Sequence, residues 1–194
     1  MKNLVRILAV VLITISFAFT DIDKKVVVID VAHGGKDEGK TLKGTSEKEI
    51  VFQVAQKIKE LNTNPNLEIV LTRETDEFLS LQDRKKYINA LNPDAVISLH
   101  ANFSLKKKHN GTEIFTSPNA LKLNESEKLA EKILNNFDFR EVRIKKTNFF
   151  LLKSVDAPIV CVELGFLSNT EDFNFLTSEG GQNQLARSIL KSVE

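Results

Sequence analysis

Three polar residues of this chain follow short β-branched segments that have the composition of buried strands. His33 comes shortly after the first such segment, His100 directly follows a second, and Glu163 directly follows a third. In open α/β sheets, ligands gather at the carboxyl ends of the strands. We therefore expect these three side chains to meet at one edge of a sheet.

Glu47 is expected to reach the same edge from a helix. Ser46 and Glu49 form a Ser-x-x-Glu capping box, which predicts a helix that begins at Glu47. Glu47 lies three and four residues before Ile50 and Val51, so it extends the apolar stripe that faces the core. A helix that follows a strand begins at the strand's carboxyl end, so this carboxylate should point inward there.

Two imidazoles and two carboxylates at one edge suit a catalytic zinc site. Zinc takes three protein ligands in such sites, often two His and one Glu, and leaves the fourth position to water. The remaining carboxylate then serves as general base toward that water. We assign His33, Glu47 and His100 to one Zn²⁺ ion and Glu163 to catalysis. These ligands are spread along the chain and form no compact motif, so spacing alone is a weak signal.

Each candidate also has a simpler explanation. His33 could be a surface residue of a glycine-rich turn, Glu47 could merely favour the helix dipole, and His100 could be a hydrogen-bonded core histidine. Glu163 is harder to explain in this way, because a buried carboxylate is costly without a partner.

The remaining histidine and the cysteine receive structural interpretations. We expect His109, beside Lys106, Lys107 and Lys108, to lie in a solvated loop, although this basic run could also touch an anionic polymer. Cys161 is the only cysteine, so no internal disulfide can form, and its apolar surroundings predict a small buried hydrophobe.

The elements that position these residues alternate along the chain. Apolar β-branched runs predict strands at 25–30, 69–72, 95–99, 111–115 and 159–162, with a weaker sixth at 149–152. Helical stripes are formed by Ile50, Val51, Val54, Ile58 and Leu61; by Leu81, Tyr87, Ile88 and Leu91; by Leu129, Ile133, Leu134 and Phe137; and by Leu185, Ile189, Leu190 and Val193. This alternation predicts an α/β fold in a single domain, with a mostly parallel twisted sheet of about six strands and helices on both faces.

Composition is consistent with one globular domain. The chain has 194 residues, of which 42% are hydrophobic, and its formal net charge is +1. This length can bury a core without disulfides. The near-neutral charge gives no reason to expect a nucleic-acid partner.

The N-terminus has the layout of an export signal. Lys2 and Arg6 precede an apolar run at 7–15, and a signal peptidase could cut before Phe19. We expect a signal peptide at 1–18, its end lying at about 20 at most, followed by a catalytic domain at 24–194. The alternative is an uncleaved anchor, but the run is shorter than the ~20 residues that a spanning helix needs. We therefore expect no stable membrane span after cleavage, and export to the periplasm or cell envelope, or secretion.

Three segments carry a resemblance to a known family. They are Val-Ile-Asp-Val-Ala-His-Gly-Gly-Lys-Asp at 28–37, Ser-Leu-His-Ala-Asn at 98–102 and Val-Glu-Leu-Gly-Phe-Leu-Ser-Asn at 162–169, supported by Glu47-Lys48, Leu-Thr-Arg at 71–73 and Lys-Thr-Asn-Phe at 146–149. In this order and spacing they resemble the zinc-dependent N-acetylmuramoyl-L-alanine amidase catalytic domain. The resemblance implies that His33, Glu47 and His100 bind zinc and that Glu163 is catalytic.

Two departures from the family pattern have consequences. Val31-Ala32 replaces the Pro-Gly that usually precedes the His-Gly-Gly turn, which could change the turn's backbone. Some periplasmic members carry a helix between the second histidine and the catalytic Glu that plugs the site until an activator binds. Here His100 and Glu163 are 63 positions apart (163 − 100), so we expect no such plug.

The resemblance implies hydrolysis of the amide bond between N-acetylmuramic acid and L-alanine in peptidoglycan. The alternatives are a zinc peptidase that cuts within the stem peptide and an inactive peptidoglycan-binding module. Arg73 and Asn102 are candidate substrate-binding residues, and Arg73 could instead pair with Glu74 or Asp76. Asp30 could accept a hydrogen bond from His33, or could simply be a structural residue at the strand end. We expect a monomer with peptidoglycan as its partner; any activator or localisation protein is unknown.

Overall fold

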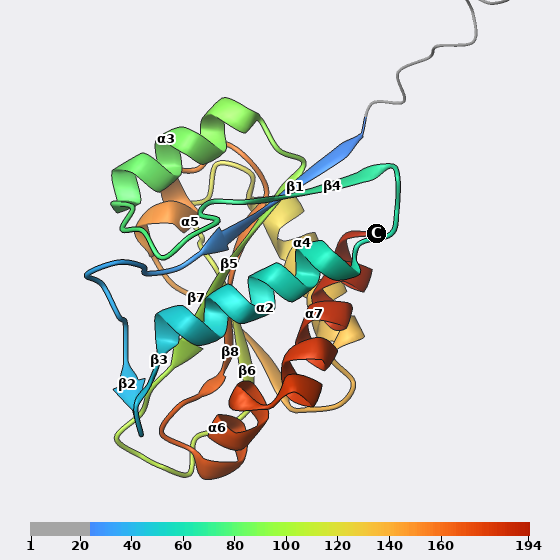
Figure 1. The fold of residues 1–194 in the computed structure, drawn as a ribbon. Helices are drawn as coiled ribbons and strands as arrows, with labels where there is room; N and C mark the ends of the chain where they lie inside the picture. Colours follow the sequence, from blue (N-terminus) through green and yellow to red (C-terminus); the bar gives the residue numbers. More distant parts are fainter. Residues whose placement is uncertain (1–23) are drawn as a thin grey trace, which may run out of the picture.

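The computed structural model describes residues 24–194 (Figure 1). The expected signal segment at 1–18 therefore lies outside the described residues. Among the described residues, no helix combines the length and the apolar character needed to cross a membrane.

A six-stranded sheet forms the centre of the fold. Its order is β4-β1-β5-β8-β6-β7, with β1 at Lys25–Val31, β4 at Leu67–Leu71, β5 at Ala95–Asn102, β6 at Thr112–Thr116, β7 at Val142–Lys146 and β8 at Ile159–Phe166. Every neighbouring pair is parallel except β6 with β8. A separate antiparallel ribbon pairs β2 (Thr41–Leu42) with β3 (Thr45–Ser46). The predicted mostly parallel α/β sheet is thereby confirmed.

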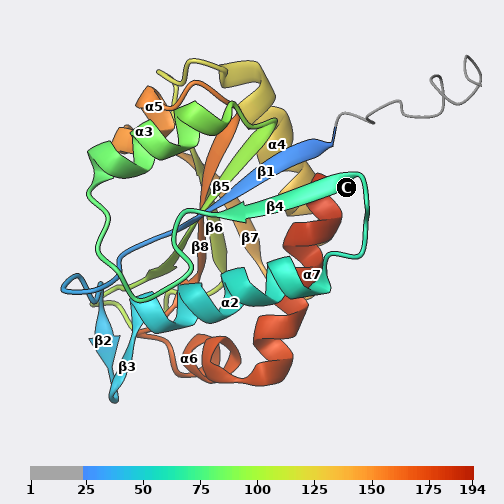
Figure 2. The same ribbon diagram turned by 45° about the horizontal axis from the view of Figure 1, so that its top comes forward.

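Helices cover both faces of this sheet, as the sequence predicted (Figure 2). The helices are α2 at Glu47–Leu61, α3 at Leu81–Leu91, α4 at Leu123–Asn136, α5 at Phe150–Ser154, α6 at Thr170–Thr177 and α7 at Glu179–Val193. The apolar side chains of α2, α4, α6 and α7 share one large core cluster with one face of the sheet. On the other face, α3 and α5 contribute to a smaller cluster around Val28, Val96 and Cys161. Cys161 is buried, as expected.

The capping box begins α2 where the sequence placed it. The Glu49 carboxylate accepts hydrogen bonds from the Ser46 N–H and the Ser46 hydroxyl, each at 2.9 Å. The next turn of the helix buries Ile50 and Val51 completely. Glu47, the first residue of the helix, is only 5% exposed, so its carboxylate points inward as predicted.

The prediction of the sixth strand was wrong in position. Residues 149–152 belong to α5 and the turn before it, and the true sixth strand is β7. A run of four apolar residues cannot by itself distinguish a strand from a buried helical turn. The sequence of β7, Val-Arg-Ile-Lys-Lys, is largely polar because this strand lies at the sheet edge and is only partly covered. The apolar stripe predicted for α3 also included two residues that do not face the core, since Leu81 and Tyr87 are exposed.

A row of charged and polar side chains crosses the face on which α3 and α5 pack. His100, Glu163, Glu113 and Arg143 are register partners on the consecutive strands β5, β8, β6 and β7. Register partners point to the same face of a sheet, and neighbouring strands are about 4.8 Å apart. The sheet therefore aligns these four groups beyond the apolar cluster, and the candidate site is built along this row.

Candidate metal centre and catalytic site

His33 occupies a tight turn that follows β1. Its backbone has a φ of 61°, a left-handed conformation that is uncommon for a residue other than glycine. The Arg84 guanidinium holds this turn, because it donates hydrogen bonds to the carbonyls of Val31 and His33. Arg84 comes from α3, so the long-range contact fixes a geometry that the local sequence disfavours.

Asp30 holds Arg84 in place and does not contact the His33 ring. Its carboxylate is 1% exposed and accepts hydrogen bonds from Ser98 Oγ at 2.6 Å, Thr72 Oγ1 at 3.1 Å and Arg84 Nη1 at 3.0 Å. The structure thus favours the structural interpretation of Asp30 over its role as a direct acceptor for His33.

The acceptor beside His33 is Asp37, which the sequence argument did not single out. Asp37 Oδ2 lies 2.9 Å from His33 Nδ1. Metal-binding histidines commonly have a carboxylate at the nitrogen that faces away from the metal, which fixes the ring's orientation. The sequence feature that could have indicated this contact is the spacing of four residues between His33 and Asp37. Both residues belong to the segment at 28–37 that was noted for the histidine.

The three predicted ligands converge on one point. Glu47 Oε1 lies 2.9 Å from His33 Nε2 and 3.1 Å from His100 Nδ1, and one donor atom from each residue lies within 4.8 Å of the others. Both His33 nitrogens are buried and, among the described residues, neither has a hydrogen bond of acceptable geometry, although carboxylate oxygens stand at 2.9 Å. Two imidazoles and a carboxylate, with ring nitrogens left unsatisfied, match the donor set of a zinc site.

The charges of this cluster favour an ionised carboxylate. Burial alone would raise the pKa of Glu47, but His100 and His33 outweigh it and hold this pKa well below its usual range. Burial would lower the pKa of His33, but the Glu47 and Asp37 carboxylates beside its two ring nitrogens outweigh burial and raise it. The same imidazole lowers the pKa of Asp37. Glu47 therefore remains an ionised carboxylate across the physiological pH range.

Glu163 lies on β8 directly across from His100. Its Oε2 atom is buried and has no hydrogen-bond partner within residues 24–194. Burial is the main reason that the pKa of Glu163 rises to about 7; the charges of Glu47 and Glu113 add to this, while His100 and His33 oppose it. A carboxyl group with a pKa near neutrality can both accept and return a proton, as a general base and acid must.

Glu113 is a further acidic residue of the row that the sequence argument missed. It is 4% exposed and pairs with Lys145 Nζ at 2.6 Å, while Asn102 Nδ2 donates to it at 3.2 Å. Successive residues of a strand point to opposite faces, so the neighbouring apolar Ile114 indicated only that Glu113 faces away from the main core. Asn102, a predicted substrate-binding residue, thus lies beside the row and already donates a hydrogen bond to Glu113.

Arg73 does not have the surroundings expected of a substrate-binding residue. It is 2% exposed, and its guanidinium donates to the backbone carbonyls of Val31, Ala32, Lys48 and Thr75. Those four bonds use four of its five N–H groups. The structure thus favours a structural role for Arg73 over either suggestion made from the sequence, because its guanidinium ties β1 to the start of α2.

Two adjoining hollows open beside the ligand cluster. One, of about 230 Å³, is lined by His33, Asp37 and Phe78 among others. The second, of about 280 Å³, runs along Glu163, Cys161 and the apolar side chains of α5. His100 lines both, so the first hollow places a substrate beside two of the candidate ligands and the second places it between His100 and the candidate base.

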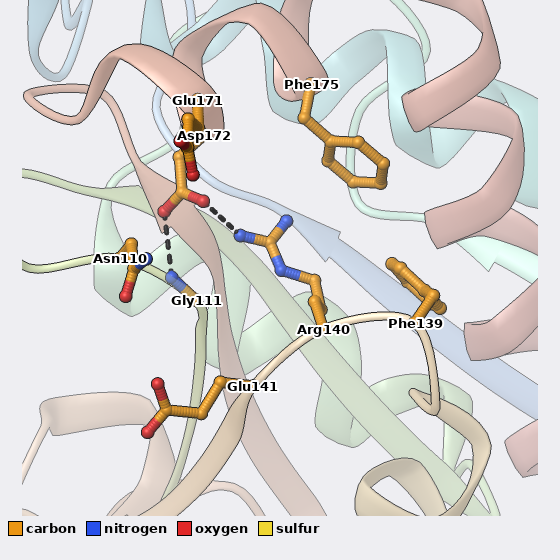
Figure 3. Close-up of a pocket in the computed structure, with 8 residues that line it drawn as sticks. All are labelled: Asn110, Gly111, Phe139, Arg140, Glu141, Glu171, Asp172 and Phe175. Carbon is orange, nitrogen blue, oxygen red and sulfur yellow. Dashed lines mark hydrogen bonds and ion pairs between the residues drawn. The ribbon is translucent and has the colours of Figure 1, made fainter.

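A larger hollow of about 320 Å³ lies elsewhere and contains none of the four site residues (Figure 3). Asp172, at its centre, accepts hydrogen bonds from the N–H groups of Gly111 at 3.0 Å and Phe166 at 2.7 Å, and pairs with Arg140. Its carboxylate is therefore already compensated. We assign this group to holding β6, β8 and α6 together.

Comparison with known proteins places the chain in a family. A family model described as N-acetylmuramoyl-L-alanine amidase matches residues 27–194. The N-acetylmuramoyl-L-alanine amidase CwlM of Bacillus licheniformis is 31% identical over 165 residues, which are 83% of this chain and 64% of CwlM. The chain thus spans less than two thirds of that relative.

Two solved structures show the same architecture. The catalytic domain of CwlV, an N-acetylmuramoyl-L-alanine amidase from Paenibacillus polymyxa, has 35% identity and a TM-score of 0.80, covering 87% of this chain and 96% of that one. The CwlD amidase of Clostridioides difficile, in complex with the GerS lipoprotein, has 29% identity and a TM-score of 0.78, covering 88% and 96%.

Replacing Asp30 tests whether its ion pair supports the turn. Asp30→Ala leaves the buried Arg84 unpaired, so the free energy of unfolding should fall by about 3–5 kcal/mol. Urea denaturation measures this change. Lys59→Ala is the control, because it breaks an exposed pair with Glu74 and should cost less than about 1 kcal/mol. Equal effects of the two substitutions would contradict this role of Asp30.

Gly39 gives a second test, because it faces the ligand cluster. A Cβ atom there would lie 2.5 Å from Glu47 Oε2 and 2.9 Å from His33 Cδ2. Gly39→Ala should therefore weaken zinc binding by about 10- to 100-fold, as disturbed neighbours of metal ligands do. Gly44→Ala is the matched control, since Gly44 also has a positive φ but open space around it. Competition with a chelating dye measures both affinities, and equal losses would show that only backbone strain matters.

Proposed function

This chain belongs to the N-acetylmuramoyl-L-alanine amidase family, and we propose that it hydrolyses the amide bond between N-acetylmuramic acid and L-alanine with one Zn²⁺ ion. In this proposal His33, Glu47 and His100 hold the ion, and Glu163 is the general base. The observation that carries it is the convergence of two imidazoles and an ionised carboxylate beside a second, unpaired carboxyl group.

The chain's own residues would divide the chemistry between them. When bound, the Zn²⁺ ion would supply Lewis acidity, which lowers the pKa of water and polarises the substrate carbonyl. Glu163 would take a proton from the attacking water and return it to the amine that leaves with the stem peptide. Its raised pKa suits it to hold the proton between these two steps. Asp37 would keep the His33 ring oriented throughout.

We propose that the site needs no displacement of an internal plug. The segment between His100 and Glu163 forms β6, α4, β7 and α5. The buried side chains of α4 belong to the large core cluster, on the face of the sheet opposite to Glu163. Of these four elements, α5 lines the hollow beside the candidate base, together with Phe149 just before it. This arrangement supports an enzyme that is active without an activator.

We further propose that the protein acts outside the cytoplasm, on peptidoglycan, after removal of residues 1–18. Its relatives named as amidases and the layout of the N-terminal sequence support this location. We propose a monomeric domain at 24–194. Because a CwlD amidase is seen in complex with the GerS lipoprotein, a comparable envelope protein could serve here for localisation.

The first test compares the wild type with Glu163→Gln on purified peptidoglycan. The variant should retain zinc, because Glu163 is not a proposed ligand, and should lose activity by at least about 100-fold, the usual contribution of a general base. Mass spectrometry of the products and metal analysis of both proteins provide the readout. Glu127→Gln, at an exposed pair on α4, is the control and should remain active.

The products also decide between the alternatives. Intact stem peptides released from glycan would support the amidase, whereas shortened peptides still attached to glycan would indicate a peptidase. Binding to peptidoglycan without any product would leave only a binding module.

Metal removal provides an independent test. Dialysis against a strong chelator should abolish peptide release, and one equivalent of Zn²⁺ should restore it with no other protein present. Activity that persists in verified metal-free protein would contradict the zinc mechanism. Activity that returns only when a second protein is added would contradict the absence of a plug.

A further inference from the structure

The position of Glu163 gives the site a direction. The three proposed ligands come from the turn after β1, from the start of α2 and from β5, while Glu163 lies on β8. The leaving amine must come within hydrogen-bond reach of the group that returns its proton. In the sheet order, β6 and β7 continue from β8 on the side away from the ligands. The stem peptide, which starts at this amine, is thus directed over β6 and β7.

Lys145 is a cationic residue on β7, along the direction proposed for the stem peptide, and some of its N–H donors are unused. Its Nζ pairs with Glu113 Oε1 at 2.6 Å, its side chain is 47% exposed, and an ammonium group has three N–H donors. Arg143, on the same face of β7, donates to the Asn110 carbonyl and to Glu141, and its Nε lies 3.7 Å from Glu113, so three groups hold its guanidinium in place. Among residues 24–194, Lys145 has a single hydrogen-bond partner and therefore retains two N–H donors for a substrate group, whereas three partners hold the Arg143 guanidinium at the strand edge.

The spacing suits an anion close to the scissile bond. Two strand spacings, about 10 Å, separate the backbones of β8, which carries Glu163, and β7. The Lys145 side chain extends from β7 toward β8, because its Nζ contacts Glu113 on the intervening strand β6. In a stem peptide whose second residue is D-glutamate linked through its γ-carboxyl, the free α-carboxylate lies about 6 Å from the scissile nitrogen. A carboxylate at that distance can reach Lys145.

We propose that Lys145 binds the free α-carboxylate of the second stem-peptide residue and makes the enzyme prefer this carboxylate over a carboxamide. The inference rests on the proposed amidase function. It adds a specificity-determining residue outside the zinc ligands and the base. Amidation of the second residue would remove the charge and one acceptor oxygen, and would place N–H donors against an ammonium group.

The test uses two soluble peptidoglycan oligomers that differ only in having D-glutamate or D-isoglutamine as the second residue. The wild type should show a kcat/KM about tenfold higher for the carboxylate form, and Lys145→Gln should reduce this ratio to about one. Lys145→Arg should restore most of the preference. Lys146→Gln is the matched control, because Lys146 lies next on β7 but pairs with Glu127.

A binding measurement provides a readout that does not depend on turnover. In the zinc-loaded Glu163→Gln background, calorimetry should show the same roughly tenfold difference between the Kd values of the two oligomers, and Lys145→Gln should remove it. If Lys145→Gln only destabilised the protein by leaving Glu113 unpaired, binding of both oligomers would weaken equally, and the ratio of their Kd values would not change.

The outcomes separate this inference from the function on which it rests. If the wild type cleaves both oligomers equally well, or if Lys145→Gln retains the preference, the assignment of Lys145 is overturned and the amidase function stands. If neither the oligomers nor intact peptidoglycan release peptides, the proposed function itself fails.

Discussion

Glu47 places an ionised carboxylate inside the protein, and the arrangement of the site depends on compensating this charge. Its Oε1 atom accepts a hydrogen bond from the Ala101 N–H at 3.1 Å and contacts both imidazoles, while Oε2 accepts one from the Lys40 N–H at 3.1 Å. An isolated buried charge would be strongly destabilising. The loop before α2, the end of β5 and the turn after β1 must therefore all converge on this residue.

The two carboxyl groups of the site differ because their surroundings differ. Glu47 is held ionised by two imidazoles, whereas Glu163 is buried beside two acidic neighbours and has a pKa of about 7. A pair of carboxyl groups whose environments push their pKa values apart can take different roles, one as a charged ligand and the other as a proton carrier. The cross-strand pairing of Glu163 with Glu113 contributes to this difference, and Lys145 and Asn102 stabilise Glu113 in turn.

Local patterns predicted much of this structure, and their limits are physical. The inward position of Glu47 was predicted from helical spacing. The position of His33, His100 and Glu163 at the carboxyl ends of strands was predicted from the composition of those strands. The roles of His33, Glu47, His100 and Glu163 remain predictions that the experiments above address. Asp37 lies only four residues from His33, but nothing in the spacing showed that the turn would bring its carboxylate to the imidazole. Glu113 and Lys145 could not be found from local patterns, because their importance comes from contacts between different strands. A single sequence does not contain the register that joins β8 to β6 and β6 to β7. The burial of Arg73 was missed for the same reason.

The asymmetry of the two sheet faces explains how one domain can be stable and still keep an open polar site. Four helices bury one face in a continuous apolar cluster, which supplies most of the hydrophobic stabilisation. Within residues 24–194, the opposite face is covered by α3 and the short α5 over a smaller cluster, and the row from His100 to Arg143 continues beyond it. Burying these groups would be costly without compensation, and two features reduce the cost: Glu113 pairs with Lys145, and the raised pKa of Glu163 lets this carboxyl group hold a proton. The polar row therefore belongs on the less covered face, where a long polymer can reach it.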